Sequence, residues 1–344
     1  MGRIKSVDVS RLIAIGAVIA IHTQPFLALS PGKESTFGEL GWVINQLGRF
    51  AVPFFFIMAG YFWALKQRGS DQPLLASMKM ARRVAIVLIA WSLIYLVPFN
   101  VVKMWNLDFL GPLRLAYWNL AKLAVDPLAL LGQSTKVHLW FLIALLWALA
   151  IAAFLRAATR VNTMLAIGIA FFVFALLGKP YANTPFGFDV PIQLRNGPFF
   201  GTVLFATGIL LSRITSSPSW LYKGIAVFAL GLMCQMTELY VLWSRFDTSA
   251  FQDFTIGTFF MGLGFSMVAL SNHPILQSER LSAVGQYTLG IYAIHFVFVD
   301  MFVDVAQYWT SPYWQVAYPL VVGMLSIGTV LVMARSESLR KIVS

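Results

Sequence analysis

The chain alternates between apolar stretches and shorter polar ones, and most of the apolar stretches are of membrane-spanning length. They lie near residues 12–29, 46–65, 84–102, 138–155, 163–177, 198–212, 224–241, 255–270, 286–304 and 315–333. About 20 apolar residues cross a bilayer as a helix, so the pattern predicts an all-α, polytopic integral membrane protein with about ten transmembrane helices. No polar stretch is long enough to form a soluble domain, so we expect residues 1–344 to be a single membrane domain.

Positive charges gather at one set of helix ends. If the N-terminus is cytoplasmic, most of the 25 Lys and Arg residues lie on that side, and most of the 14 Asp and Glu residues lie on the other. The positive-inside rule therefore predicts that both the N- and C-termini are cytoplasmic. It also accounts for the net charge of +11, so we expect membrane lipids and no nucleic acid as partners.

The composition excludes a soluble globular protein, because only 11% of the residues are charged, against about 25% in soluble domains. The single cysteine, Cys234, excludes an intrachain disulfide, and the four histidines lack metal-ligand spacing, so no metal is expected. No cleavable signal is evident.

The polar segment 103–137 is too long for a simple turn, and we expect it to dip into the outer leaflet or to cover a cavity there.

The first predicted helix, SVDVSRLIAIGAVIAIHTQPF, places an arginine and a histidine on one face. No side chain from Leu12 to Ile21 is charged or forms hydrogen bonds, so His22 lies deep in an apolar segment. Such a residue is a functional candidate by default. Arg11 and His22 are offset by roughly 20° in rotation and by about 16 Å along the axis.

Each of these residues has an alternative interpretation. Imidazole exchanges protons near neutral pH, so His22 is a candidate general base, although it could be a packing residue. Arg11 offers donors suited to phosphate, or it anchors the helix at the interface. Asp8, one turn earlier, either orients Arg11 or caps the helix start.

Three further arginines are candidates for binding. Arg49 lies at the start of RFAVPFFFIMAGYF, where a charge is costly and Pro53 and Gly60 permit a kink or close helix packing. Arg82 and Arg83 begin the third helix next to the most basic loop, which suits an anionic cofactor. Contact with lipid headgroups is the alternative.

Polar residues near the outer ends of other helices are candidates for substrate binding. His138 and Trp140 begin HLWFLIALLWAL, and Tyr292 and His295 are i, i+3 neighbours in VGQYTLGIYAIHF. Glu238 is the only acidic residue well inside the seventh predicted span. Structural or interfacial roles are equally open for these residues.

Taken together, these segments resemble membrane-bound acyltransferase family 3 over essentially the whole chain, in order. The resemblance is carried by D-x-x-R-x10-H (Asp8, Arg11, His22), VPFFFIMAGYF after Arg49, MARRVAIVLIAW, HLWFL at 138–142 and GQYTLGIYAIHF at 285–296. Two features depart from the family pattern. Ala59 stands where the family usually has a serine, and no SGNH hydrolase-type domain is appended.

The resemblance implies an O-acyltransferase of the bacterial inner membrane. The expected donor is cytoplasmic acetyl-CoA, with succinyl or longer acyl groups left open. The expected acceptor is a hydroxyl of a glycan such as an exopolysaccharide, an O-antigen or a lipid-linked sugar. His22 corresponds to the family's proposed catalytic histidine, and Arg11 to its basic partner. The spacing of about 16 Å between them is close to the reach of a pantetheine arm.

In the mechanism that this resemblance implies, the CoA phosphates are bound by Arg82, Arg83 and Arg11, and the thioester lies at His22. His22 would deprotonate the acceptor hydroxyl for direct attack, and Tyr292 or Arg49 would stabilise the oxyanion. An acetyl-histidine relay is the second variant. The alternative from another class is a proton-coupled secondary transporter of an anionic solute, which the absence of internal repeats disfavours. The oligomeric state stays open.

Overall fold

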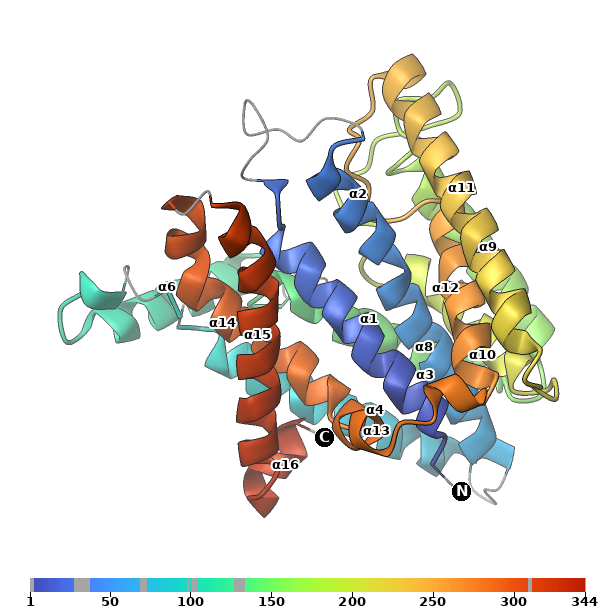
Figure 1. The fold of residues 1–344 in the computed structure, drawn as a ribbon, viewed down its shortest axis with the longest axis horizontal. Coiled ribbons are helices and arrows are strands. Elements are labelled where there is room, and N and C mark those ends of the chain that lie inside the picture. The colour runs from blue at the N-terminus through green and yellow to red at the C-terminus, as the bar shows by residue number, and fades with distance from the viewer. Residues whose placement is uncertain are drawn as a thin grey trace.

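The computed structural model describes residues 3–27, 38–68, 73–97, 99–100, 104–126, 134–308 and 311–343. Within these ranges the chain is helical and contains no strand (Figure 1). The helices are α1 (Lys5–Thr23), α2 (Leu40–Leu47), η2 (Gly48–Phe50), α3 (Ala51–Arg68), α4 (Pro73–Ile94), α6 (Gly111–Val125), η3 (Val137–Leu139), α8 (Trp140–Phe154), α9 (Val161–Leu177), α10 (Pro198–Leu211), α11 (Trp220–Phe246), α12 (Ile256–Leu270), η4 (Pro274–Leu276), α13 (Glu279–Gly285), α14 (Thr288–Tyr308), α15 (Pro312–Met333) and α16 (Glu337–Val343). The all-α fold class is thereby confirmed.

Each predicted apolar stretch coincides with one of these helices, with two differences. Helix α4 ends at Ile94 instead of running to residue 102, and residues 95–97 form a turn. The sequence has a proline at position 98, and the residue before a proline disfavours helical geometry. The chain also bends by 69° between α13 and α14, at the start of the ninth stretch. Positions 28–29, at the end of the first predicted span, lie outside the described residues.

Five helical segments of the described chain are long and apolar enough to cross a membrane. They are Lys5–Thr23, Leu40–Arg68, Val137–Phe154, Trp220–Phe246 and Pro312–Met333, and the bent α13–α14 pair raises the number to six. Helices α9, α10 and α12 are apolar but shorter. A multi-pass membrane protein follows from these helices, whereas the count of about ten spans and the cytoplasmic placement of both termini stay predictions.

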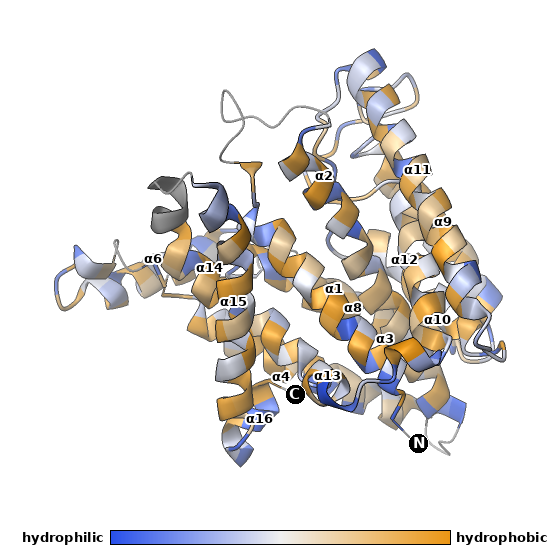
Figure 2. Ribbon diagram, in the orientation of Figure 1, coloured by the Kyte–Doolittle hydropathy of each residue, from blue (hydrophilic) through white to orange (hydrophobic). Residues whose placement is uncertain are grey.

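Helix α1 lies at the centre of the bundle, with α14 and α15 on one side and α3 and α12 on the other (Figure 1). Within the most apolar 18 residues of α1, 56% of the residues are buried in the protein. The corresponding share is 22% in α11 and in α15. The exposed faces of these peripheral helices are nonetheless rich in apolar residues (Figure 2). That pattern suits lipid contact, whereas α1 is largely enclosed by protein.

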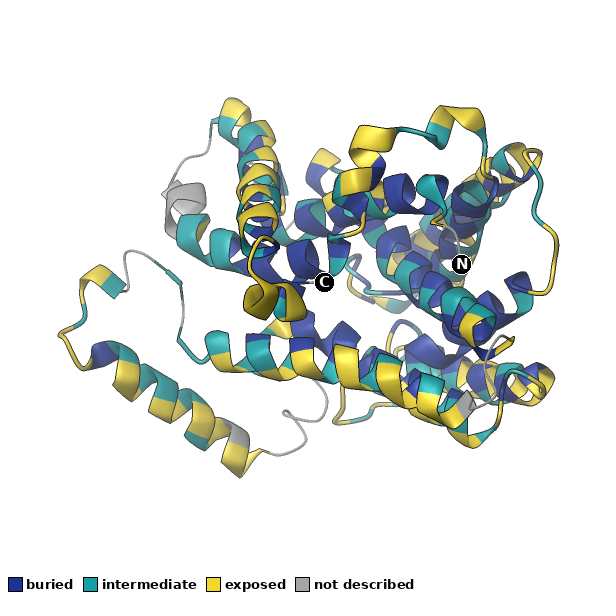
Figure 3. Cartoon of the chain, turned by 90° about the horizontal axis from the view of Figure 1, so that it is seen from below, coloured by how far each residue is buried: buried dark blue, intermediate teal, exposed yellow. Residues whose placement is uncertain are grey.

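Helix α6, from the long segment 103–137, lies at the edge of the molecule. It stands apart from the bundle in two views and is largely exposed (Figures 1 and 3). Asn119 Nδ2 donates to the carbonyl of Leu96 at 2.6 Å, which ties α6 to the end of α4. The described part of this segment does not line the cavity reported below. Residues 103 and 127–133 lie outside the described residues, and the expected dip into the outer leaflet stays a prediction.

Two glycines let α3 and α10 pack backbone against backbone. A Cβ at Gly208 would lie 1.9 Å from the carbonyl oxygen of Ile57, and one at Gly60 would lie 2.0 Å from that of Phe205. Small residues at such crossings are the usual means of close helix packing in membranes. This crossing fixes α3, which carries Arg49 at its outer end through η2 and several cavity residues along its length.

We therefore expect Gly208→Ala to destabilise the protein by at least about 1–3 kcal/mol, because the new methyl group forces the two backbones apart. The measurement is the thermal unfolding midpoint of the detergent-solubilised protein, followed by intrinsic fluorescence. Gly16→Ala on α1 is the matched control, since a Cβ there meets nothing within 4 Å. Equal midpoints for the two variants would contradict the close crossing.

Candidate active site

The buried carboxylate of Asp8 lies near the N-terminal end of α1 and binds two arginines. Asp8 is only 4% exposed, and its Oδ1 accepts a hydrogen bond from Arg11 Nη1 at 3.0 Å. Its Oδ2 accepts one from Arg3 Nε at 2.5 Å. Asp8 makes no capping hydrogen bond at the helix start, so it orients Arg11. A Cβ at Gly285 would lie 2.0 Å from the Asp8 carbonyl, which shows how closely α13 approaches this point.

A cavity of about 740 Å³ opens beside Arg11, between α1, α3, α4, α8, α13 and α14. This volume lies within the range of sites for small molecules and cofactors. Its charged lining is strongly basic: Arg3, Asp8, Arg11, Lys66, Lys79 and Arg83. An anionic ligand group would be favoured at this end.

The other end of the cavity is apolar. Phe55, Phe141 and Tyr292 contribute to that wall, and the cationic residues contribute to the opposite one. Phe55 and Lys66 are eleven residues apart on α3, so the cavity extends about 16 Å along that helix. Ala59 lies between them on the wall, so the hydroxyl that the family usually has at this position is missing from the lining.

Three histidines from separate parts of the chain meet beside Tyr292, and none of the three is among the residues that line the cavity. The ring centroids of His22 and His295 are 5.3 Å apart, and those of His295 and His138 are 5.1 Å apart. Phe296 contacts His22 at 4.7 Å and stacks on His138 at 4.5 Å. His138 and His295 are almost fully buried, whereas His22 is partly exposed.

Tyr292 connects the cavity to this histidine cluster. It lines the cavity, its hydroxyl donates to the backbone carbonyl of His138, and its ring lies 5.9 Å from that of His295. A ligand with its anionic part among the arginines and lysines would therefore extend toward the histidines.

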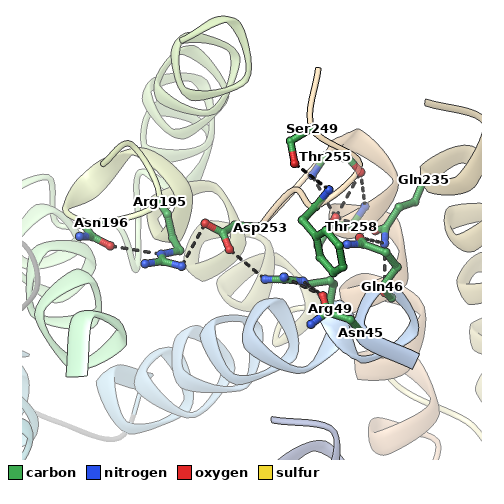
Figure 4. A network of polar contacts seen from close by, with 11 residues as sticks. Asn45, Gln46, Arg49, Arg195, Asn196, Gln235, Ser249, Asp253, Thr255 and Thr258 are labelled. Carbon is green, nitrogen blue, oxygen red and sulfur yellow. Dashed lines mark hydrogen bonds and ion pairs between the residues drawn. The ribbon is translucent and has the colours of Figure 1, made fainter. Parts of the chain in front are cut away.

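Two arginines share one carboxylate in a polar network away from the cavity lining (Figure 4). Arg49 Nη1 lies 2.9 Å from Asp253 Oδ1, and Arg195 Nη1 lies 3.0 Å from Asp253 Oδ2. Burial opposes ionisation of this carboxyl, but Arg49 and Arg195 outweigh it and hold the pKa of Asp253 below its usual value. One negative charge among two positive ones leaves an excess positive charge.

This cluster reaches the start of α8. Arg195 also lies over the ring of Trp140, with its Cζ 4.9 Å from the ring centroid. Arg195 thus links Trp140 to Arg49 through the shared carboxylate of Asp253. Trp140 and Arg49 were both predicted as substrate-binding residues.

Glu238 has structural contacts in this fold. Its carboxylate accepts hydrogen bonds from the backbone N–H groups of Ile256 and Gly257 at the start of α12, at 3.0 and 3.2 Å. The hydroxyl of Tyr181 donates to it at 2.6 Å. Burial and this carboxylate raise the pKa of Tyr181 above its usual value. Glu238 is thus an acidic cap at a helix N-terminus, and a role in substrate binding stays a prediction.

The structure separates the two neighbouring arginines of α4. Both side chains are exposed, but only Arg83 is among the residues that line the cavity. Lys66, Lys79 and Arg3 line it without having been predicted, although all three belong to the basic side identified from charge. Asp253 was also missed, because a lone aspartate in a loop gives no signal of its two partners.

Comparisons with known proteins support one family. The family described as an acyltransferase domain matches residues 4–334, nearly the whole chain. Among curated proteins, an amino-acid racemase of Enterococcus faecalis is 26% identical over 253 residues. That match covers 70% of this chain but only 32% of the racemase, so the chain spans about a third of that protein's length. No solved structure matches the chain. The extent of the family match shows that the chain belongs to acyltransferase family 3.

Proposed function

We propose that this protein is an integral membrane O-acyltransferase. It moves an acetyl group from cytoplasmic acetyl-CoA to a hydroxyl of a cell-surface or periplasmic glycan, with His22 as general base. The carrying observation is a basic cavity whose wall includes Tyr292, a residue that also contacts His138 and His295, and His295 packs in turn against His22. The bacterial inner membrane is the location that suits a cytoplasmic thioester donor and an outer acceptor.

The basic end of the cavity supports a CoA donor. CoA carries its phosphates at one end and the thioester at the other, joined by a long, weakly polar arm. Five cations stand against one carboxylate in the lining, and Arg11 is held in place by Asp8. The cavity length of about 16 Å along α3 lets the phosphates stay at this end while the thioester reaches the apolar end.

The acceptor would enter from the opposite side. Arg49, Arg195 and Trp140 form a charged and aromatic group that would meet it. Arginine forks and aromatic faces are suited to recognise sugars and their acidic substituents. In this scheme His22 lies between donor and acceptor, as the transfer requires.

In the transfer step the acceptor oxygen bonds to the thioester carbonyl carbon and the C–S bond breaks. His22 takes the hydroxyl proton and returns it to the departing thiolate, so no co-reactant is needed. The hydrogen bonds that the two side chains already make favour Arg49 over Tyr292 as the group that stabilises the oxyanion. Tyr292 already uses its only O–H on the His138 carbonyl, whereas the described contacts of Arg49 use three of its five N–H groups.

Nanodiscs separate this proposal from a proton-coupled transporter. A nanodisc has no enclosed compartment, so a transporter can give no net uptake there, whereas an acyltransferase still releases CoA. We expect the purified protein in nanodiscs to release free thiol from acetyl-CoA when a glycan extract of the cell envelope is added, with label appearing on the glycan. Uptake by proteoliposomes lacking any acyl-CoA, together with no thiol release in nanodiscs, would contradict the proposal.

A further inference from the structure

Helix α6 is tied to the bundle at one end of α4. After α4 ends at Ile94, Asn119 Nδ2 in α6 donates to the carbonyl of Leu96 at 2.6 Å. Beyond α6, Thr135 Oγ1 donates to the carbonyl of Ser92 at 2.8 Å, directly before η3 and α8 begin. Helix α6 therefore lies at this end of the bundle, and its 15 residues are fewer than the about 20 that a transmembrane helix needs.

One face of α6 carries an exposed apolar stripe. Leu113, Tyr117 and Leu120 are spaced by four and three residues, so they lie together along the helix. Their exposed fractions are 67%, 66% and 56%. Helical spacing places Arg114 and Lys122 elsewhere, with a mean direction roughly 130° from the stripe. The helix is therefore amphipathic, and the described part of the protein leaves most of its apolar face uncovered.

Exposed aromatic side chains surround this stripe. Trp105 and Phe109, just before α6, are 86% and 96% exposed, and Trp118 within α6 is 61% exposed. Tryptophan and tyrosine are enriched where a bilayer meets water, because their rings are apolar and their N–H or O–H groups are polar. On the adjoining end of α4, Ile89 and Leu93 are exposed as well, so an apolar surface of the bundle continues to α6.

We propose that α6 is an interfacial helix that binds the lipid surface at the end of the bundle away from the basic cavity. The stripe of Leu113, Tyr117 and Leu120 lies among the lipid acyl chains, about 5–10 Å below the headgroups. Arg114 and Lys122 lie at the level of the lipid phosphates. Figure 1 shows α6 running across the direction of α15, as a helix in the membrane plane would. This placement does not depend on the proposed acyl transfer.

Two other partners fit the apolar stripe less well. A lid over the cavity would have to reach Val84, the last residue of α4 in the cavity lining, which lies roughly 15 Å before Ile94 along the helix. A second copy of the chain on the stripe would leave Trp118 in water, because Trp118 points in the mean direction of Arg114 and Lys122. The headgroup region of a bilayer accommodates aromatic side chains on every face of the helix.

Spin labels at single cysteines test this placement. The protein has one cysteine, which is exposed, so Cys234→Ser gives a cysteine-free background. Leu113→Cys and Tyr117→Cys place labels on the stripe, and Lys122→Cys places one on the opposite face. Leu93→Cys on α4 is the lipid-facing reference. These four positions are exposed, so a label disturbs little packing. The protein is reconstituted in nanodiscs of phosphatidylcholine and phosphatidylglycerol.

The measured quantity is the ratio of two accessibilities, to oxygen, which concentrates in hydrocarbon, and to a water-soluble nickel chelate. We expect this ratio at positions 113 and 117 to be close to that at 93 and several-fold higher than that at 122. Equal access of the nickel chelate to both faces would place α6 in water and overturn the proposal. Labels at 113 and 117 that neither reagent reaches would place protein over the stripe and would also overturn it.

Brominated lipids then measure depth. A bimane label at Tyr117→Cys is compared in lipids brominated close to the headgroup and in lipids brominated close to the chain end. We expect stronger quenching by the shallow bromines, since the stripe lies at the boundary between headgroups and acyl chains. Stronger quenching by the deep bromines would indicate a segment that dips into the bilayer and would contradict a helix lying along its surface.

Discussion

We expect the His22→Gln protein to transfer acyl groups roughly 10²–10⁴-fold more slowly than the wild type and yet to bind acyl-CoA with unchanged affinity. Loss of a general base removes an interaction that acts in the transition state, so the effect belongs in kcat. The basic residues proposed to bind the CoA phosphates are left intact, and Arg11 among them lies about 16 Å from His22 along α1.

The measurement for this variant pairs single-turnover transfer with equilibrium binding of a non-hydrolysable acyl-CoA analogue. Glutamine keeps polarity and much of the volume of histidine, which limits disturbance of the packing against Phe296 and His295. His273→Gln, the same substitution outside the cavity, provides the control. A His22→Gln protein with lost binding and normal turnover per bound donor would contradict the assignment of His22.

The second large effect concerns the donor. We expect Arg11→Ala to weaken acyl-CoA binding by about 10- to 150-fold, because a charge-assisted hydrogen bond contributes about 1.5–3 kcal/mol. Removing Arg11 also leaves Asp8, which is 4% exposed, with Arg3 as its remaining charged partner, so a negative charge would face the phosphates. Lysine would restore the charge but not the fork, and Arg11→Lys should recover only part of the affinity.

The neighbouring arginines of α4 sharpen this prediction. Arg83→Ala should weaken binding, whereas Arg82→Ala should have a much smaller effect, because only Arg83 lines the cavity. Lys223→Ala, which removes an exposed charge from α11, controls for general electrostatics. The quantity compared is the Kd for acetyl-CoA at two salt concentrations. Equal losses from Arg82→Ala and Arg83→Ala would place the phosphates on the surface of α4 and contradict the cavity as the donor site.

Local patterns in the sequence predicted the elements of this fold well. Uninterrupted apolar stretches are enough to predict helices, and helical spacing relates Arg11 to Asp8, which the structure joins at 3.0 Å. The end of α4 was extended too far because hydropathy outweighed the proline at position 98. The 69° bend between α13 and α14 lies where Gly285 packs closely against Asp8, a long-range contact that no local pattern encodes.

Individual residues of the candidate site could be predicted from the sequence, but their arrangement in space could not. His22, His138 and His295 each carried a signal of their own, yet their meeting requires α1, η3 and α14 to converge. Sequence reasoning likewise could not choose between Arg82 and Arg83, because side-chain direction on α4 depends on which face the bundle covers. Asp253 gained significance only through its two arginine partners.

The most direct test of the central claim is a transfer assay with radiolabelled acetyl-CoA, purified protein in nanodiscs and an envelope-glycan extract, comparing the wild type with His22→Gln. The account predicts label on the glycan and release of CoA with the wild type, and loss of both with His22→Gln. Transfer at the wild-type rate by His22→Gln would contradict it.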